Sequence, residues 1–126
     1  MNIPKDLKYT TDHQWVDESA PKFRVGLTDY AQDALGEVVF VKLPDIDQVI
    51  TAGGSFAEVE STKSVSDIYA PVTGTIVEVN EELRDSPGKI NSDPYGEGWI
   101  CVIDPSGGAD SQRLMDADEY GRLVDS

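Results

Sequence analysis

Apolar and polar side chains alternate with the two-residue period of β-strands in many short segments of this chain. Residues 56–60 show this pattern, and residues 37–43 give the strongest strand signal. Further strands are predicted over residues 9–16, 23–27, 49–52, 67–70, 75–79 and 98–103. Short strands separated by Gly, Pro, Asp and Asn predict a mainly β fold, with two antiparallel sheets packed as a sandwich.

Short helices are expected beside these strands. Thr28 is a good N-cap for a helix that runs to Leu35 and ends at Gly36. Asn80 is predicted to cap one helical turn over residues 81–84. The chain is therefore predicted to consist mainly of strands, with short helices in the connections between them.

The last third of the chain combines a loop and a tail. Residues 90–98 are rich in Asn, Asp, Pro and Gly and are predicted to form a loop, with Tyr95 as its one large anchor. Asp116 followed by Glu119 resembles a capping box, which predicts a C-terminal helical tail. Gly121 makes that tail an intrinsically weak helix.

One lysine, Lys63, lies near the middle of the hairpin predicted from residues 56–60 and 67–70. The short polar stretch 61–64 suits a tight turn between the two strands. Most lysines are only solvated surface charges. This one, however, has no other basic residue near it in a long acidic stretch, and a rigid hairpin that exposes one amine suits the attachment of a carrier arm.

The residues around this lysine also form a motif. Glu60-Ser61-Thr62-Lys63 is followed by Ser66-Asp67-Ile68-Tyr69-Ala70-Pro71 and by Gly74. Related motifs occur at Tyr9-Thr10, His13, Trp15, residues 26–32, 35–41, 77–80 and 91–96, and Gly98-Trp99. In this order, and over almost the whole chain, they closely resemble the H-protein family of the glycine cleavage system.

The resemblance implies a fold and a cofactor. The fold is a single domain over residues 1–126, a sandwich of the lipoyl and biotinyl carrier type (a barrel-sandwich hybrid) with short peripheral helices. The cofactor is lipoate, joined to Lys63 by an amide bond. Glu60 and Ser61 lie where lipoylating enzymes would read the hairpin, although plain turn polarity also explains them.

The resemblance also implies a cycle with three partner enzymes. A pyridoxal-phosphate glycine decarboxylase passes an aminomethyl group to the arm, and a folate-dependent aminomethyltransferase takes its methylene and releases ammonia. Dihydrolipoyl dehydrogenase then reoxidises the arm. The chain itself would be a carrier and not an enzyme, with the chemistry supplied by the attached group.

A cleft that shelters the loaded arm is a further implication. It would be lined by Asp67 and by the early segment that contains Asp12, His13 and Gln14. H proteins usually have an acid at the position of Gln14, and a carboxylate binds an ammonium group more strongly than an amide does. With glutamine there, Asp12 and Asp67 are the candidate anions.

Three other interpretations remain open. A lipoyl domain of an oxo-acid dehydrogenase or a biotin carrier would show Asp-Lys-Ala or methionines at the lysine, whereas Thr62 and Ser64 flank it here. An H-like lipoate relay or regulator that does not serve glycine cleavage would keep the same hairpin. A plain β-sandwich binding module leaves the chain-wide resemblance unexplained.

The amino-acid composition limits the classes of partner that the chain is expected to bind. Ten basic and 24 acidic residues give a formal charge of −14 and a pI near 4.1. Nucleic acid and anionic membranes are therefore not expected partners. The acidity serves solubility, or steers the chain toward basic patches on partner enzymes.

Few residues are suited to catalysis. His13 is the only histidine, and no nucleophile or metal-ligand spacing accompanies it. The single cysteine, Cys101, lies in an apolar run and is expected to be a buried hydrophobe in a reducing compartment. With no leader-like or membrane-spanning pattern, the expected location is the bacterial cytoplasm, and a processed form in the mitochondrial matrix stays open.

Overall fold

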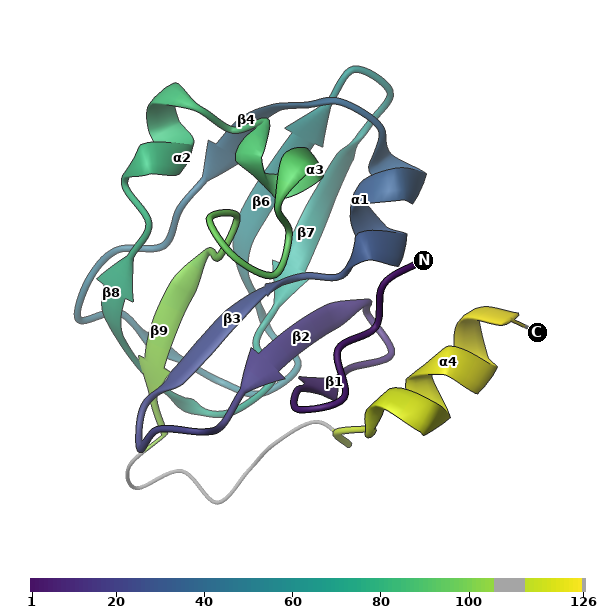
Figure 1. Ribbon diagram of the computed structural model, residues 1–126. Helices are drawn as coiled ribbons and strands as arrows, with labels where there is room; N and C mark the ends of the chain where they lie inside the picture. Colours follow the sequence, from purple (N-terminus) through teal and green to yellow (C-terminus); the bar gives the residue numbers. More distant parts are fainter. Residues whose placement is uncertain (106–112, 126) are drawn as a thin grey trace.

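The computed structural model describes residues 1–105 and 113–125, and it contains two antiparallel sheets (Figure 1). The larger sheet has the strand order β1-β2-β3-β9-β8-β5, and the smaller has the order β4-β6-β7. The larger comprises β1 Lys8–Tyr9, β2 Gln14–Asp17, β3 Phe23–Leu27, β5 Val49–Ile50, β8 Gly74–Val79 and β9 Cys101–Asp104. The smaller comprises β4 Val38–Lys42, β6 Ser55–Ser61 and β7 Val65–Tyr69. This confirms the predicted mainly β sandwich.

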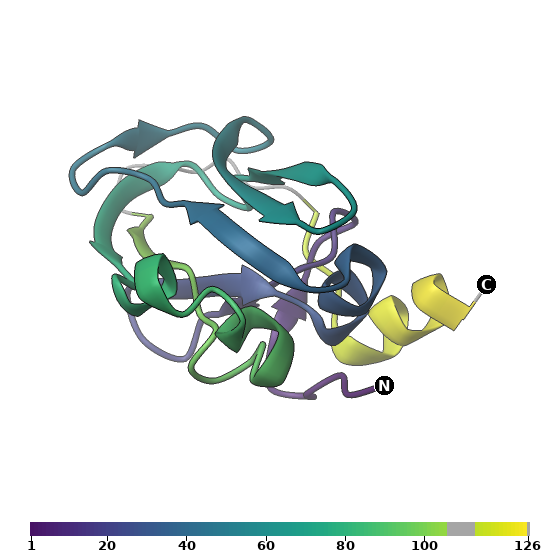
Figure 2. The same cartoon turned by 90° about the horizontal axis from the view of Figure 1, so that it is seen from above.

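Four helices lie at the rim of the two layers in the described part of the chain (Figure 2). They are α1 Asp29–Leu35, α2 Glu82–Asp85, α3 Lys89–Ser92 and α4 Ala117–Asp125. None of the helices in residues 1–105 and 113–125 is long and apolar enough to cross a membrane.

The main core lies between the sheets. Val41 and Val59 are register partners in the smaller sheet, and both are almost fully buried. They face buried side chains of the larger sheet such as Val25, Ile76 and Ile103. Alternation along each strand sends these residues inward and the polar ones outward. A second cluster, which contains Tyr9, Trp15, Met115 and Tyr120, holds α4 against β1.

The prediction of one strand over residues 9–16 was wrong, because β1 and β2 form a hairpin there. The Thr10 hydroxyl accepts hydrogen bonds from the backbone N–H groups of Asp12 and Gln14, both at 3.3 Å. The backbone N–H of His13 also bonds to the Thr10 carbonyl at 3.1 Å, and His13 adopts a φ of 65°. This local bonding closes a turn within a segment whose side chains alternate like those of a strand.

The prediction for α1 was confirmed. The Thr28 hydroxyl accepts a hydrogen bond from the Ala31 N–H at 3.1 Å, as an N-cap should. Gly36, with a φ of 78°, ends the helix and donates its N–H to the Gln32 carbonyl at 3.0 Å. A glycine suits this left-handed conformation, which a side chain would strain.

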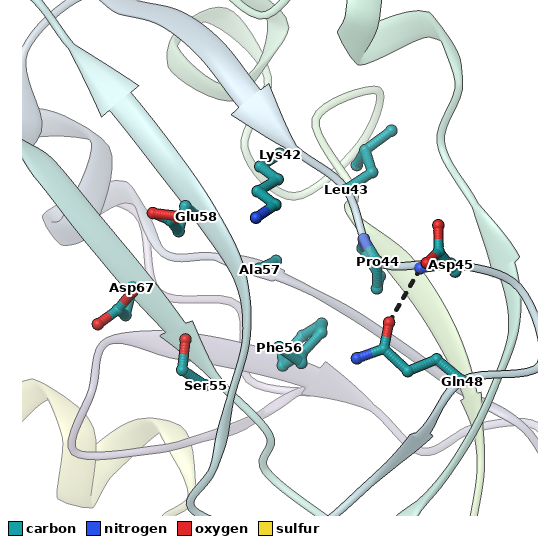
Figure 3. Close-up of a pocket in the computed structure, with 10 residues that line it drawn as sticks. All are labelled: Lys42, Leu43, Pro44, Asp45, Gln48, Ser55, Phe56, Ala57, Glu58 and Asp67. Atoms are coloured by element: carbon teal, nitrogen blue, oxygen red, sulfur yellow. Dashed lines mark hydrogen bonds between the residues drawn. The ribbon is translucent and has the colours of Figure 1, made fainter.

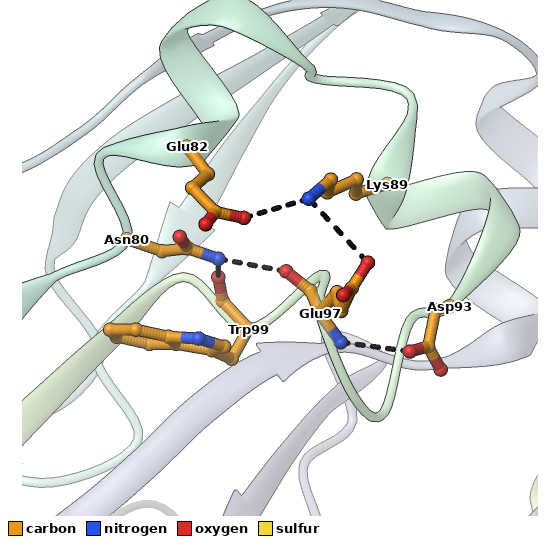
Figure 4. A network of polar contacts seen from close by, with 6 residues as sticks. All are labelled: Asn80, Glu82, Lys89, Asp93, Glu97 and Trp99. Atoms are coloured by element: carbon orange, nitrogen blue, oxygen red, sulfur yellow. Dashed lines mark hydrogen bonds and ion pairs between the residues drawn. The ribbon is translucent and has the colours of Figure 1, made fainter.

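The prediction that Asn80 caps a helix was wrong. The side chain of Asn80 makes no capping bond to α2, and its amide instead donates to the carbonyls of Glu97 and Trp99, both at 2.8 Å (Figure 4). Asn80 is buried, so its amide ties the segment before β9 to the end of β8.

The predicted loop over residues 90–98 contains part of α3, which corrects that prediction. Ile90 is fully buried and anchors this one-turn helix. Lys89 forms ion pairs with Glu82 at 2.7 Å and with Glu97 at 3.5 Å across the same region (Figure 4). Exposed pairs of this kind contribute little, so burial of Ile90 is the main cause of the helix.

The predictions for Cys101 and the C-terminal tail were confirmed. Cys101 is fully buried, and burial raises the pKa of its thiol. Asp116 caps α4, since its carboxylate accepts a hydrogen bond from the Glu119 N–H at 2.8 Å. The second half of the predicted capping box is replaced, because the Glu119 carboxylate pairs with Arg113.

Candidate functional site

The turn that presents Lys63 is closed by one serine. The Ser61 hydroxyl accepts hydrogen bonds from the backbone N–H groups of Lys63 and Ser64, at 3.1 and 3.2 Å. The Ser61 N–H donates to the Ser64 carbonyl at 2.8 Å. Ser61 is buried, whereas Lys63 is exposed between β6 and β7. The hydrogen bonds of the buried Ser61 therefore hold the backbone of the turn that exposes Lys63.

The turn is also attached to the body of the protein. The Thr62 N–H donates to the Glu37 carbonyl at 3.0 Å, which fixes the tip beside the start of β4. The aliphatic stem of Lys63 crosses Gly36, where an added Cβ would lie 2.7 Å from the lysine Cε. Figure 1 shows the β6–β7 turn projecting beyond α1. The amine is thus exposed in a fixed frame.

A supporting residue that the sequence analysis did not identify lies behind Gly36. The amide nitrogen of Asn91 donates to the Gly36 carbonyl at 2.8 Å and to the Gln32 side chain at 3.0 Å. Its amide oxygen accepts from the Val38 N–H at 2.9 Å. Asn91 therefore joins α3, the end of α1 and the start of β4. Its place in the 91–96 motif was the only available signal.

A groove of about 250 Å³ runs beside the hairpin. Three of the predicted cleft residues, Asp12, His13 and Asp67, line it together. The rest of its lining is mostly apolar or small: Leu27, Tyr30, Ala31, Ala34, Leu35, Val59, Ser64 and Ser66. The groove therefore combines apolar side chains with two carboxylates, one imidazole and the hydroxyl-bearing side chains of two serines and a tyrosine.

Gln14 does not line this groove, which corrects the expectation from sequence. It is 1% exposed, and its side-chain oxygen accepts from the Tyr69 N–H at 2.8 Å. Its amide nitrogen donates to the Tyr69 carbonyl at 2.5 Å. Because β7 is an edge strand, these backbone groups need a partner, and the Gln14 amide bonds to them as a neighbouring strand would.

His13 is held in one orientation at the groove. Its ring lies 4.5 Å from the Tyr30 ring, and its Nδ1 lies 2.9 Å from the Tyr120 hydroxyl. The Tyr120 hydroxyl in turn lies 2.7 Å from the Thr28 hydroxyl. Burial lowers the pKa of His13 despite the opposing charge of Asp12. The imidazole is therefore neutral near pH 7, and α4 helps to position it.

A second, more polar hollow of about 440 Å³ lies on the outer face of the smaller sheet (Figure 3). Lys42, Glu58 and Asp67 are register partners across β4, β6 and β7 at this hollow. Its other lining residues belong mainly to the start of β6 and the chain after β4. It therefore lies toward the end of the hairpin that is remote from Lys63.

No cluster of His, Cys, Asp and Glu side chains in residues 1–105 and 113–125 is suited to hold a metal ion. At the tip, over residues 61–64, Lys63 supplies the one side-chain amine. A β-sandwich that presents an exposed lysine on a braced hairpin, beside a groove, has the arrangement of a carrier domain.

The chain belongs to the glycine cleavage H-protein family, whose model matches residues 7–126. It is 48% identical over 124 residues to the glycine cleavage system H protein of Bacillus subtilis, covering 98% of each chain. It is 46% identical over 123 residues to that of Halalkalibacterium halodurans, covering 98% of this chain and 96% of the relative.

A solved structure agrees with this assignment. The H protein of Mycobacterium marinum superimposes with a TM-score of 0.91 at 44% sequence identity, covering 98% of this chain and 100% of the other. The family and the fold implied by the sequence motifs are therefore confirmed. Membership of this family makes the chain a carrier component of the glycine cleavage system.

Proposed function

We propose that lipoate is attached by an amide bond to Nζ of Lys63, and that the protein carries aminomethyl groups without catalysing their transfer. The exposed amine at the tip of the braced β6–β7 turn is the observation that carries this proposal. When bound, lipoate supplies a dithiolane that accepts the aminomethyl group and is later reoxidised.

The residues below the tip fit such an arm. Ser61 and the Glu37 carbonyl hold the turn, so a modifying enzyme meets the amine in one geometry. Gly36 leaves room for the lysine stem to lie close to the backbone. None of these contacts uses Nζ itself, so modification at Nζ costs the turn no hydrogen bond.

The groove beside the hairpin supports transient binding of a cationic amine. Asp67 and Asp12 offer carboxylates there, and α1 supplies apolar contacts. A neutral His13 adds no positive charge that would repel the amine. Asp67 lies on β7, a few residues from Lys63, and is therefore the better placed carboxylate.

In this proposal the lipoyl arm enters the active sites of three partner enzymes in turn. They are glycine decarboxylase, aminomethyltransferase and dihydrolipoyl dehydrogenase, and a lipoylating enzyme acts before them. The described residues support a passive role: Cys101 is fully buried, and His13 contacts the Tyr120 hydroxyl and the rings of Tyr30 and Tyr120. The bacterial relatives support a cytoplasmic location.

The test is reconstitution of glycine cleavage with purified partner enzymes and lipoylated protein. The parent should support carbon dioxide release from glycine, and Lys63→Arg should support none although it folds normally. Lys42→Arg, at another exposed lysine, is the matched control and should keep parent activity. Activity in Lys63→Arg would refute the attachment site. A lipoylated parent that supports no exchange of the glycine carboxyl with bicarbonate would refute the carrier role and favour a lipoate relay.

A further inference from the structure

One hydroxyl on the C-terminal helix α4 joins two segments that line the groove beside the hairpin. The Tyr120 hydroxyl lies 2.9 Å from Nδ1 of His13 and 2.7 Å from Oγ1 of Thr28. His13 lies in the β1–β2 turn and lines the groove, and Thr28 caps α1, which also lines it. Figure 1 shows α4 beside β1 at this edge of the molecule. The three polar atoms therefore form one hydrogen-bonded chain from the cap of α1 through α4 to the groove.

The two hydroxyls of this chain are closed off from solvent. Tyr120 and Thr28 are both 0% exposed. Within the described residues, the Thr28 hydroxyl makes one further hydrogen bond, which it accepts from the Ala31 N–H at 3.1 Å, and the Tyr120 hydroxyl makes no further one. Burial raises the pKa of Tyr120 to about 12, so its hydroxyl keeps its hydrogen near neutral pH. Both hydroxyl hydrogens must therefore find their acceptors inside the chain.

The number of hydrogens decides the direction of the chain. It has two contacts, and its two hydroxyls supply two hydrogens. If Nδ1 of His13 carries no hydrogen, Thr28 donates to Tyr120, Tyr120 donates to Nδ1, and both contacts are filled. If Nδ1 carries a hydrogen, three hydrogens share two contacts, and one buried hydrogen has no acceptor. An unpaired buried donor is costly, so the arrangement with a bare Nδ1 is favoured.

The direction of the chain determines what His13 presents to the groove. A neutral imidazole with a bare Nδ1 carries its hydrogen on Nε2. In the described part of the chain Nε2 makes no hydrogen bond, whereas every buried side-chain nitrogen and oxygen there has a partner, so Nε2 is open to solvent. Asp12 and Asp67 line the same groove. Nε2–H donates to an acceptor atom but cannot accept from an ammonium group, so the carboxylates are the charged acceptors for a cationic amine.

We propose that Tyr120 is a positioning residue that fixes His13 as the Nε2–H tautomer, so that the groove receives the ammonium group of a loaded arm at its carboxylates and not at its imidazole. The identity of that amine rests on the proposed function. The titratable groups around His13 are Asp12 on the same turn, Tyr30 on α1, Tyr120 on α4 and Asp67 across the groove on β7. Protonation of Nδ1 meets the same hydrogen-bond penalty, which adds to the burial that lowers the pKa of His13.

The test is nitrogen NMR of the unmodified chain, without a histidine tag and labelled with nitrogen-15 histidine. His13 is the only histidine, so the spectrum contains one imidazole, and the shifts of its two nitrogens report which of them carries hydrogen. At pH 8, above the ordinary histidine pKa of about 6.5, the parent should show a bare Nδ1 and a protonated Nε2. A parent with its hydrogen mainly on Nδ1 would overturn the proposal, whether or not any variant folds.

Tyr120→Phe keeps the ring that stacks on Tyr9 and removes the hydroxyl. The preference for Nε2–H should fall about tenfold and the pKa of His13 should rise by about one unit, because one hydrogen bond that favours the neutral form is lost. Tyr95→Phe is the matched control, since the Tyr95 hydroxyl lies in the same aromatic cluster but accepts from the Asp29 N–H at 3.0 Å. It should leave the tautomer ratio within about twofold of the parent. Equal spectra for the parent and Tyr120→Phe, or the same change in both variants, would overturn the proposal.

The same spectrum of the loaded chain tests what the imidazole does beside the arm. After the lipoyl arm has received an aminomethyl group, Nε2 should still carry its hydrogen. A bare Nε2 with the hydrogen on Nδ1 would mean that the imidazole accepts from the ammonium group, and would overturn the proposal. The spectra of the unmodified chain do not depend on lipoate. A failed tautomer prediction therefore leaves the carrier function intact, and a chain that is never lipoylated refutes attachment at Lys63 without changing the tautomer result.

Discussion

Gln14→Glu replaces an amide by a carboxyl group of the same shape at a fully enclosed position. In the parent, Gln14 donates one hydrogen bond to the Tyr69 carbonyl and accepts one from the Tyr69 N–H. An ionised glutamate keeps the second bond and loses the first, because it has no proton to donate. The Tyr69 carbonyl then faces a negative charge, so the link from β2 to β7 should weaken.

The size of the effect follows from burial. Position 14 is 1% exposed, so ionisation there is disfavoured by desolvation and by the opposing carbonyl dipole. The remaining N–H bond favours ionisation in part, so we expect a folded-state pKa raised by about 2 units. At about 1.36 kcal/mol per unit, Gln14→Glu should lose about 2 to 3 kcal/mol of unfolding free energy at pH 8.

The loss should depend on pH in a defined direction. A protonated glutamate can donate to the Tyr69 carbonyl and accept from its N–H, as the glutamine does. Because the folded-state pKa is raised above the unfolded value of about 4.3, stability is kept below that value and lost as the pH rises through the folded-state pKa. The difference from the parent should therefore be small near pH 4 and grow up to about pH 7.

Denaturant unfolding of parent and variant at several pH values measures this difference. Gln48→Glu is the matched control, because the Gln48 side chain accepts a hydrogen bond from the Asp45 N–H at 3.1 Å and an ionised glutamate can keep it. The control should stay within about 0.5 kcal/mol of the parent. A Gln14→Glu variant as stable as the parent at pH 8, or one whose deficit shrinks with rising pH, would refute the link to Tyr69.

Three further predictions concern the site and its support. Asn91→Ala should lower the unfolding free energy by about 2 to 3 kcal/mol in denaturant titration, because it leaves the Gly36 carbonyl and Val38 N–H unpaired; an effect under about 0.5 kcal/mol would contradict this. In His13→Asn, asparagine tolerates the φ of 65°, and the variant lacks an imidazole whose pKa is lowered on folding. The unfolding free energy of the parent relative to this variant should therefore fall as the pH drops below about 6.5. A difference in unfolding free energy that does not change with pH would contradict this prediction. Glu58→Gln should reduce the salt dependence of arm loading by the decarboxylase more than Asp118→Asn does, as the Debye length falls from about 30 Å at 0.01 M to about 8 Å at 0.15 M salt; equal slopes would leave the acidity to solubility.

Local patterns in the sequence predicted the parts of the fold that local chemistry determines. Alternation located most strands, and Thr28 and Gly36 marked both ends of α1, because their partners lie within one helical turn. The polar stretch 61–64 marked the turn for the same reason. Lys63 was identified as a candidate by its place in a predicted turn and by the motif around it, because an exposed lysine alone does not indicate a function.

Three of the failures share a physical cause, which is that a polar side chain bonds to backbone far away in sequence. Gln14 bonds to Tyr69 and Asn91 bonds to Val38, and no periodicity or spacing reveals such partners. Asn80 has the composition of a cap but bonds to carbonyls near β9. The helix α3 is one turn long and depends on burial of Ile90, which a short window cannot predict.

The intact mass of the protein from a lipoate-replete host, followed by peptide mapping, tests the central claim most directly. The account predicts a gain of one lipoyl group, located on the peptide that contains Lys63, and no gain in the Lys63→Arg variant. An unmodified protein from such a host, or a lipoyl group found on Lys42 or Lys89, would contradict it.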